Sequence, residues 1–387
     1  MKITILGRGN AGCLTALHYG YYTRNLENIS IELIYDPDIS PEKVGQASLL
    51  PLPVLLWAAL GINWYDNPIE ATPKFGILYE NWGTKEKSFA SPFPLHNVGL
   101  HYDPAKLQKV ILNSGYFTVQ EKHIDKYDEI DSDFIFDCRG KPSGNWDDYE
   151  ELTNPLNSVI LGQGASKEAD INWTRAVATP DGWTFVIPNT TQTTSYGYLY
   201  NDEISSTEEA TANFEKIFSL EKQGVHQAEI SSLKFKNYVA KKPIIDERII
   251  LGGNRLFFLE PLESTAGEAY IYWARSTFDW VINKASTPAH ISQEFSNYTH
   301  QIQNYVMWHY MYGSKYDTPF WEAAKNLKIE DPLFNDFLTT AKKHSMSELL
   351  DNDSIFLKER YGQYGLWNFK SWHNSMTKEG PAPFHLP

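Results

Sequence analysis

A glycine-rich segment near the amino terminus has the spacing of a dinucleotide-binding turn. It reads Gly7-Arg8-Gly9-Asn10-Ala11-Gly12, which is G-x-G-x-x-G. In such a turn the first glycine permits the tight bend, the second lets the backbone approach a pyrophosphate, and the third lets the following helix pack closely on the strand. The phosphate then lies at the positive N-terminus of that helix. We therefore predict nucleotide contacts from Gly7, Gly9, Asn10, Ala11 and Gly12.

An acidic residue follows at the spacing expected for a ribose-binding group. Asp36 comes 24 residues after Gly12, at the end of a second apolar run, and the usual offset is ~20 residues. The alternative is a tight turn in an unrelated α/β protein, because a lone fingerprint is a weak signal. An enzyme that holds both FAD and NAD(P)H usually has two fingerprints, whereas this chain has one. This favours FAD alone, with reducing power supplied from elsewhere.

The elements around the fingerprint predict an α/β fold. Residues 2–6 and 29–35 are short apolar runs on either side of a helical pattern at 11–24, which is typical of parallel strands joined by a crossover helix. The apolar run at 49–60 predicts a buried helix, and Asp103 before Pro104 predicts the start of another. Further strands are predicted at residues 75–82, 116–121, 133–138 and 248–251.

The middle of the chain has a different pattern. Short strand-like runs between residues 158 and 238, the last at 233–238, are separated by Gly, Pro, Asn and Asp turns. A helix at 207–220 opens with the capping box Ser206-x-x-Glu209, and the pattern after residue 266 is helical. We predict a FAD-binding Rossmann-like module with an inserted, mainly antiparallel sheet and a C-terminal helical region, as in flavin monooxygenases. The predicted parts are a FAD-binding module at 1–285, its inserted substrate-side sheet at about 155–245, and a helical substrate-side region at 286–387.

Charge and composition disfavour several kinds of partner. The net charge of -14 opposes binding to nucleic acid and to anionic membranes. No apolar run approaches the ~18 residues of a membrane-spanning helix. The two cysteines, Cys13 and Cys138, lie in apolar surroundings, which indicates neither a disulfide nor a metal site. Without a signal peptide, the chain is expected in a reducing cytoplasm. The oligomeric state stays open, a homo-oligomer included.

Several motifs, in the same order along the chain, resemble those of the flavin-dependent halogenases of the tryptophan-halogenase type. The most specific are Lys74 ahead of an Asn81-Trp82 pair, and Glu260-Pro261-Leu262-Glu263-Ser264-Thr265, which is identical to the family's E-P-L-E-S-T. Other elements similar to the family's are His101-Tyr102-Asp103, Phe136-Asp137-Cys138-Arg139-Gly140, Trp183-x-Phe185-x-Ile187-Pro188, Trp308-His309-Tyr310 and Asp317-Thr318-Pro319-Phe320-Trp321. The resemblance spans nearly the whole chain.

The chain departs from the tryptophan-halogenase pattern in three ways. Phe185 stands where W-x-W-x-I-P has its second tryptophan, and together with Pro188, Ser195 and Gly197 it forms F-x-x-P…S-x-G. This looser pattern resembles a broader branch of the family that includes a phage-encoded member. The segment at 45–48 reads G-Q-A-S where the family has G-E-A-T, and the C-terminal part is shorter. The resemblance therefore does not carry tryptophan specificity over to this chain.

The resemblance implies a halogenation chemistry. Reduced FAD and O2 would convert chloride, bromide or iodide into hypohalous acid, which must be guided to the substrate and kept from the flavin. Lys74 would deliver the halogen, either as an ammonium that hydrogen-bonds hypohalous acid or as a neutral amine that forms a haloamine, and burial would favour the amine. Glu263 would orient the acid and accept the substrate proton. A carboxylate there would also complement the dipole of the helix that follows.

The other implied site residues fall into three groups. Gly253 and Pro261 would join the fingerprint and Asp36 around FAD, while Ser264, Thr265, Ala266 and Gly267 would bind halide at a helix N-terminus. Trp183, Phe185, Pro188, Phe93 and His101 would line the tunnel and substrate pocket, although aromatic side chains such as Phe185 also serve as core. The implied partners are a separate NAD(P)H flavin reductase and a small electron-rich aromatic or heteroaromatic substrate. A flavin-dependent aromatic hydroxylase and a non-catalytic FAD-binding regulator are the rival interpretations.

Overall fold

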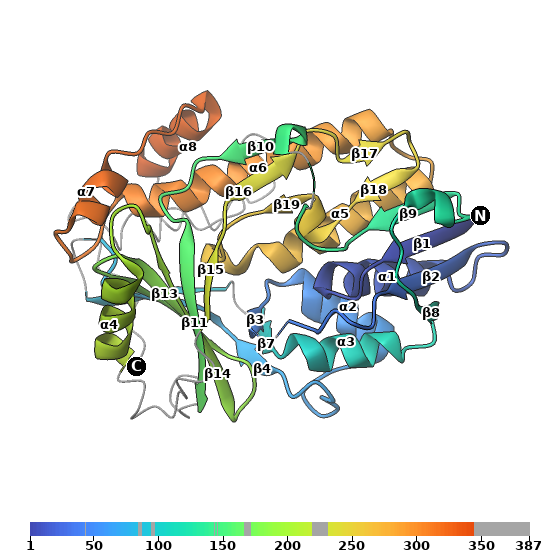
Figure 1. Cartoon of the computed structure of the whole chain (residues 1–387), viewed down its shortest axis with the longest axis horizontal. Helices are drawn as coiled ribbons and strands as arrows, with labels where there is room; N and C mark the ends of the chain where they lie inside the picture. Colours follow the sequence, from blue (N-terminus) through green and yellow to red (C-terminus); the bar gives the residue numbers. More distant parts are fainter. Residues whose placement is uncertain are drawn as a thin grey trace.

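The glycine-rich turn follows the central strand of a six-stranded sheet, on the right of Figure 1. In this sheet β1 (Lys2–Leu6) pairs in parallel with β2 (Ser30–Tyr35) and β9 (Phe134–Asp137). Strands β8 (Thr118–Glu121) and β18 (Ile249–Leu251) extend it in parallel. At one edge, β17 (Ile244–Ile245) pairs antiparallel with β18. This sheet, with α1 (Asn10–Thr23) as the first crossover helix, confirms the predicted α/β fold.

The computed structural model describes the chain from residue 1 to residue 343, apart from short gaps. The described residues are 1–42, 44–83, 87–93, 97–142, 144, 146–165, 172–218 and 231–343. The predicted helical region beyond 343, and the last two residues of the helix predicted at 207–220, lie outside them. Within these ranges no helix is long and apolar enough to cross a membrane. Both cysteines in them are buried and free.

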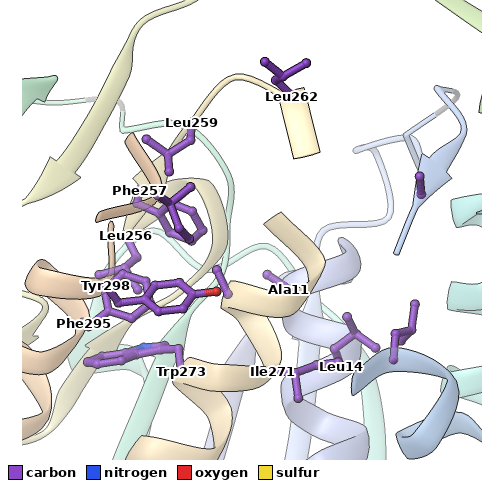
Figure 2. Close-up of a cluster of buried hydrophobic side chains, with 14 of the residues drawn as sticks. Ala11, Leu14, Leu256, Phe257, Leu259, Leu262, Ile271, Trp273, Phe295 and Tyr298 are labelled. Carbon is purple, nitrogen blue, oxygen red and sulfur yellow. The ribbon is translucent and has the colours of Figure 1, made fainter. Parts of the chain in front are cut away.

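A buried aromatic and aliphatic cluster joins the nucleotide-binding sheet to the C-terminal helices (Figure 2). Ala11 and Leu14 on α1 face Ile271 on α5 (Ala266–Val281). Phe295 and Tyr298 of α6 (Pro288–Met311) pack beside α5. Burial of such side chains contributes about 1.5–3 kcal/mol each. This core fixes the start of α5, and hence the E-P-L-E-S-T segment before it, relative to the glycine-rich turn.

A small antiparallel sheet carries Lys74. It pairs β7 (Gly99–Tyr102) with β3 (Gln46–Ala47) on one side and with β4 (Thr72–Lys74) on the other. The preceding helix α2 (Pro51–Leu60) ends at Gly61 in a left-handed cap. The prediction that this helix is buried is wrong for one face, because Val54 and Trp57 are 56% and 67% exposed. An all-apolar run has no polar stripe to mark its outward side.

A seven-stranded sheet, on the left of Figure 1, forms the second half of the molecule. Its strands pair antiparallel, except that β5 and β12 are parallel. In spatial order they are β15 (Ser231–Lys234), β11 (Ser158–Ala165), β14 (Thr193–Tyr200), β13 (Gly182–Pro188), β12 (Thr174–Thr179), β5 (Gly76–Glu80) and β6 (Ser88–Pro92). Thus β5 and β6 join it from outside residues 155–245.

The single strand predicted at 233–238 is wrong. The chain instead leaves β15 and enters β16 (Asn237–Ala240), which lies in a separate sheet between β10 (Tyr149–Leu152) and β19 (Phe257–Phe258). The sequence does not reveal this change of sheet, because side chains alternate between the two faces of a strand in either sheet.

The predicted capping box at α4 (Thr207–Phe218) is confirmed, because Ser206 and Glu209 exchange hydrogen bonds. The Asp103 cap of α3 (Pro104–Leu112) is confirmed as well.

The F-x-x-P…S-x-G pattern has a packing reason. In the register of β13 and β14, Phe185 lies opposite Gly197. A Cβ on Gly197 would lie 2.2 Å from the Phe185 ring, so the ring occupies the space that a side chain would need. Ser195 accepts the backbone N–H of Gly45 at 2.9 Å. The pattern therefore has two packing roles. Gly197 leaves room for the Phe185 ring, and Ser195 holds the loop before β3.

Gly197→Ala is expected to destabilise the fold by about 1–3 kcal/mol, because the new methyl group overpacks the Phe185 ring. Urea unfolding of the purified protein measures this free energy. Adding Phe185→Leu should recover much of the loss, since the smaller side chain vacates the site. Additive costs in the double variant would contradict the packing argument.

Candidate active site

The glycine-rich turn has the geometry that a pyrophosphate requires. Gly7 has φ +98°, and a Cβ on Gly12 would lie 1.9 Å from the carbonyl oxygen of Gly7. A Cβ on Gly9 would meet nothing within 4 Å, so only open space borders that backbone. No side chain caps the N-terminus of α1, which leaves its first N–H groups for an anion. The turn therefore fits a phosphate-bearing cofactor.

A cavity of about 390 Å³ opens beside this turn. Gly7, Gly9, Asn10, Ala11 and Asp36 line it, as the sequence predicts. The Asp36 carboxylate, which the sequence predicts to bind ribose, contacts His123 Nδ1 at 2.6 Å. This contact holds the carboxylate at the edge of the cavity. Gly12 is not among the lining residues in the described part of the chain, and it packs against the backbone of Gly7 instead.

The other two predicted cofactor residues are not among those that line this cavity in the described part of the chain. A Cβ on Gly253 would meet Ala11 Cβ at 2.6 Å, which places Gly253 against the fingerprint helix. Pro261 is not among the lining residues in the described part of the chain. It instead accepts the N–H of Ser264 at 3.0 Å, inside the segment that precedes α5.

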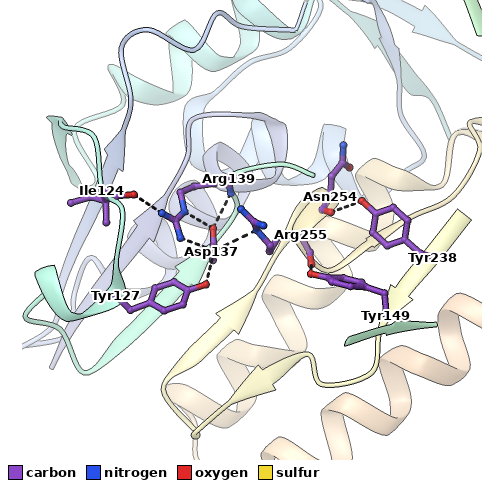
Figure 3. Close-up of polar contacts among 8 residues, drawn as sticks. All are labelled: Ile124, Tyr127, Asp137, Arg139, Tyr149, Tyr238, Asn254 and Arg255. Carbon is purple, nitrogen blue, oxygen red and sulfur yellow. Dashed lines mark hydrogen bonds and ion pairs between the residues drawn. The ribbon is translucent and has the colours of Figure 1, made fainter. Parts of the chain in front are cut away.

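Two arginines that the sequence did not assign to the cofactor site line the cavity, and Figure 3 shows both of them directed toward Asp137. The fully buried Asp137, at the end of β9, accepts from Arg139 Nε at 2.9 Å and lies 3.5 Å from Arg255 Nε. Tyr127 donates to the same carboxylate at 2.7 Å. Burial alone would raise the pKa of Asp137, but these partners hold it below its usual value. Both guanidiniums are thus fixed where a phosphate-bearing ligand would be attracted.

Lys74 is fully buried at the end of β4. Its Nζ donates to Ser264 Oγ at 2.9 Å and lies 5.4 Å from the centre of the Phe93 ring. Among the described residues Ser264 is the only hydrogen-bond partner of this amine, so two of its N–H bonds remain for a ligand. Burial lowers the pKa of Lys74 to about 7, although the Glu263 carboxylate opposes this shift. The amine and the ammonium are therefore both present near neutral pH.

Glu263 is held beside Lys74 by an unusual backbone and by two side chains. Glu263 and Ser264 adopt left-handed φ values of 70° and 58°, which cost on the order of 1–3 kcal/mol each. Glu263 Oε1 accepts from the Tyr79 hydroxyl and contacts His309 Nε2 at 2.9 Å. These partners come from β5 and α6, so two elements distant in sequence hold the carboxylate.

The His309 ring links Glu263 to the backbone of α6. Its Nδ1 lies 2.6 Å from the Tyr305 carbonyl oxygen, which only accepts, so Nδ1 carries a proton. The contact between Nε2 and Glu263 then needs a further proton, held by the imidazole or by the carboxyl. His309 is therefore placed to exchange a proton with Glu263.

Trp183 is anchored by the other carboxylate of the E-P-L-E-S-T segment. Glu260 Oε2 accepts from Trp183 Nε1 at 3.1 Å and from the Tyr310 hydroxyl at 2.7 Å. Burial raises the pKa of Glu260 to about 7. The Phe185 ring lies 6.3 Å from that of Trp183, on the same face of β13. Trp183 and Phe185, both predicted to line the tunnel, are buried, and their rings pack within the main hydrophobic core.

His101 and Pro188 support β4. The His101 ring lies between the hydroxyls of Thr72 (3.2 Å) and Thr174 (2.9 Å), and Thr72 Oγ1 also donates to the Pro188 carbonyl at 3.1 Å. These contacts of His101 are structural. They hold Thr72, which lies two residues before Lys74 on β4.

The family model described as "Tryptophan halogenase" matches residues 2–127 and 99–385. The chain belongs to the tryptophan halogenase family. The tryptophan 6-halogenase ThaL of Streptomyces albogriseolus is 28% identical over 439 aligned residues, covering 86% of this chain and 80% of ThaL.

Solved structures share the fold of this halogenase. The tryptophan 6-halogenase SttH of Streptomyces toxytricini superposes with a TM-score of 0.77 at 18% identity, over 99% of this chain and 91% of SttH. BrvH, a flavin-dependent halogenase from Brevundimonas, gives 0.71 at 16% identity, over 88% and 84% of the two chains. The predictions of a flavin-dependent halogenase and of a mixed α/β fold are confirmed.

The halogenase places its predicted halide residues at the start of α5. Thr265 is the N-cap, and Ala266 and Gly267 are the first helical residues. Thr265 is buried, and no side chain caps this helix end. Uncapped N–H groups at a helix N-terminus are suited to an anion, and Ser264, one residue before this N-cap, accepts a hydrogen bond from Lys74. The sequence did not reveal the roles of Tyr79 and Glu260, because both contacts join distant segments.

The pKa of Lys74 predicts how stability depends on pH. The folded chain releases this proton near pH 7 and the unfolded chain near 10.5, so between these values the unfolded chain binds more protons. Stability contributed by this site therefore rises with pH across the window. We expect the excess stability of Lys74→Met over wild type, measured by urea unfolding, to shrink as pH rises from 7 toward 10. A pH-independent difference would contradict the lowered pKa.

Proposed function

We propose that this halogenase uses Lys74 and Glu263 to pass hypohalous acid to an electron-rich aromatic or heteroaromatic substrate. The observation that carries the proposal is the buried Lys74 Nζ, which has Ser264 as its one hydrogen-bond partner among the described residues and lies beside the Glu263 carboxylate. Bound reduced FAD, held by the glycine-rich turn, would supply with O2 the oxidising equivalent that converts halide into hypohalous acid. Asn10, Ala11, Asp36, Arg139 and Arg255 line the cavity that would hold it.

Each residue of the site has a distinct task in this proposal. The N–H groups of Thr265, Ala266 and Gly267 bind the halide against the negative field of an acidic chain. Lys74 captures the hypohalous acid, as a hydrogen-bond donor or as an amine that accepts the halogen. Glu263 then takes the proton that the substrate ring loses when the carbon–halogen bond forms, and His309 shares it.

Trp183 and Phe185 keep the two reactions apart. Their buried rings stand on the face of β13 that packs into the main core, and Glu260 fixes the indole. A substrate excluded by this wall cannot reach the flavin, while a triatomic acid is small enough to pass along a narrow channel. A separate NAD(P)H-dependent reductase would deliver the reduced flavin, since the chain has one nucleotide-binding turn.

The test combines the purified protein with a flavin reductase, NADH, FAD, air and one halide at a time. Indoles, phenols and anilines are offered as substrates, and the products are read by mass spectrometry. The proposal predicts halogenated products that require both FAD and halide. Hydroxylated products would support an aromatic hydroxylase instead, and FAD binding without turnover would support a regulator.

A further inference from the structure

The carboxamide of Asn189 is buried without a partner. Asn189 follows Pro188 at the end of β13 and is fully buried. Neither Oδ1 nor Nδ2 has a hydrogen-bond partner among the described residues. Unpaired buried donors and acceptors cost free energy, and folded proteins rarely retain them. A donor and an acceptor left open on one side chain therefore point to a ligand.

Asn189 lies against the loop that leads from the nucleotide cavity. Ile39, Pro41 and Glu42 of this loop line the cavity. Three residues further on, Gly45 approaches so closely that a Cβ there would lie 1.7 Å from Asn189 Oδ1. The Gly45 N–H is held by Ser195 Oγ at 2.9 Å. The loop thus connects the cavity wall directly to the carboxamide.

The strand of Lys74 lies on the other side. The carbonyl oxygen of Pro188 accepts the Thr72 hydroxyl at 3.1 Å, and Thr72 begins the strand that ends with Lys74. Asn189 therefore stands between the loop that lines the cavity and the strand that carries the amine. Asn189 is not among the residues that line the cavity in the described part of the chain, but a cofactor that extends from the glycine-rich turn toward Lys74 would pass toward this point.

We propose that Asn189 hydrogen-bonds the pyrimidine edge of the bound flavin, an inference that rests on the proposed FAD cofactor. That edge presents an N–H between two carbonyl oxygens, which complements an acceptor Oδ1 beside a donor Nδ2. The resident cofactor, rather than a passing hypohalous acid, is the ligand, because both groups of the carboxamide need a lasting partner. Gly45 is required as glycine since any side chain would displace the carboxamide. Asn189 is in this sense a positioning residue for the flavin ring.

The test measures FAD affinity and apoprotein stability in the full chain. Asn189→Leu, similar in size, is expected to raise the Kd for oxidised FAD, followed by flavin fluorescence, about 10-fold or more. The Tm of its apoprotein should stay equal or rise, because an unpaired buried amide is removed. Asn189→Asp keeps the acceptor and loses the donor, and its negative charge should weaken binding of the anionic reduced flavin more than of the oxidised form.

Thr184→Val is the matched control. Thr184 lies on β13, the strand that precedes Asn189, and its buried hydroxyl has no hydrogen-bond partner among the described residues, but it lies on the same strand face as Val186, opposite the Phe185 ring. Its apoprotein Tm should behave like that of Asn189→Leu, while its FAD affinity stays at the wild-type value. Wild-type affinity in Asn189→Leu, or a fall in its apoprotein Tm that accounts for weaker binding, would overturn the inference. Wild-type protein that binds no FAD would defeat the proposed cofactor itself.

Discussion

Lys74→Met is expected to lose halogenated product by about 10³-fold while the oxidation of halide continues. The variant removes the amine but keeps the volume of the buried side chain, so the packing around this position is preserved. Hypohalous acid should then escape into solution, where a β-diketone trap detects it. Product yield and trapped halogen are measured in the same reaction with a flavin reductase, FAD and halide.

Two comparisons make the Lys74 result specific. Lys109→Met changes a surface lysine on α3 and should leave product and trap signal at wild-type values. FAD affinity of Lys74→Met should also equal that of wild type, because Lys74 does not line the nucleotide cavity in the described part of the chain. Normal product yield from Lys74→Met would end the proposal that this amine delivers the halogen.

Glu263→Gln is expected to slow product formation by about 10²-fold, because the amide cannot accept the ring proton. A substrate deuterated at the halogenated carbon provides the sharper readout. In the wild type Glu263 accepts this proton, so proton loss is fast. The deuterium isotope effect on the rate should therefore be small. In Glu263→Gln proton loss becomes slow, and a primary isotope effect should emerge.

Tyr79→Phe is the matched control for the carboxylate. It removes the hydroxyl that donates to Glu263 Oε1 but leaves the carboxylate and its His309 contact in place. A smaller loss of rate, without the primary isotope effect, is expected. Equal isotope effects in wild type and Glu263→Gln would show that Glu263 orients the reactants without taking the proton.

The sequence predicted the parts of the site that depend on short-range spacing. The G-x-G-x-x-G turn needs a tight bend and a bare helix end, and both are consequences of glycine at positions 7, 9 and 12. Local patterns also predicted the capped starts of α3 and α4. They were insufficient at α2, where uniformly apolar residues hid the exposure of Trp57, and at 233–238, where alternation hid a change of sheet.

By itself the sequence predicted an α/β protein with a dinucleotide-type turn, because short-range spacing and local periodicity suffice for that, and its motifs resembled those of the halogenases, which implied the roles of Lys74 and Glu263. Only the tertiary structure decided how those side chains are held. The contact of Lys74 with Ser264 spans 190 residues and that of Tyr79 with Glu263 spans 184. The lowered pKa of Lys74 arises from burial. Contacts between residues so far apart in the sequence, and the burial of one amine, arise only when separate elements pack together. The residues next to Lys74 in the sequence therefore cannot predict them.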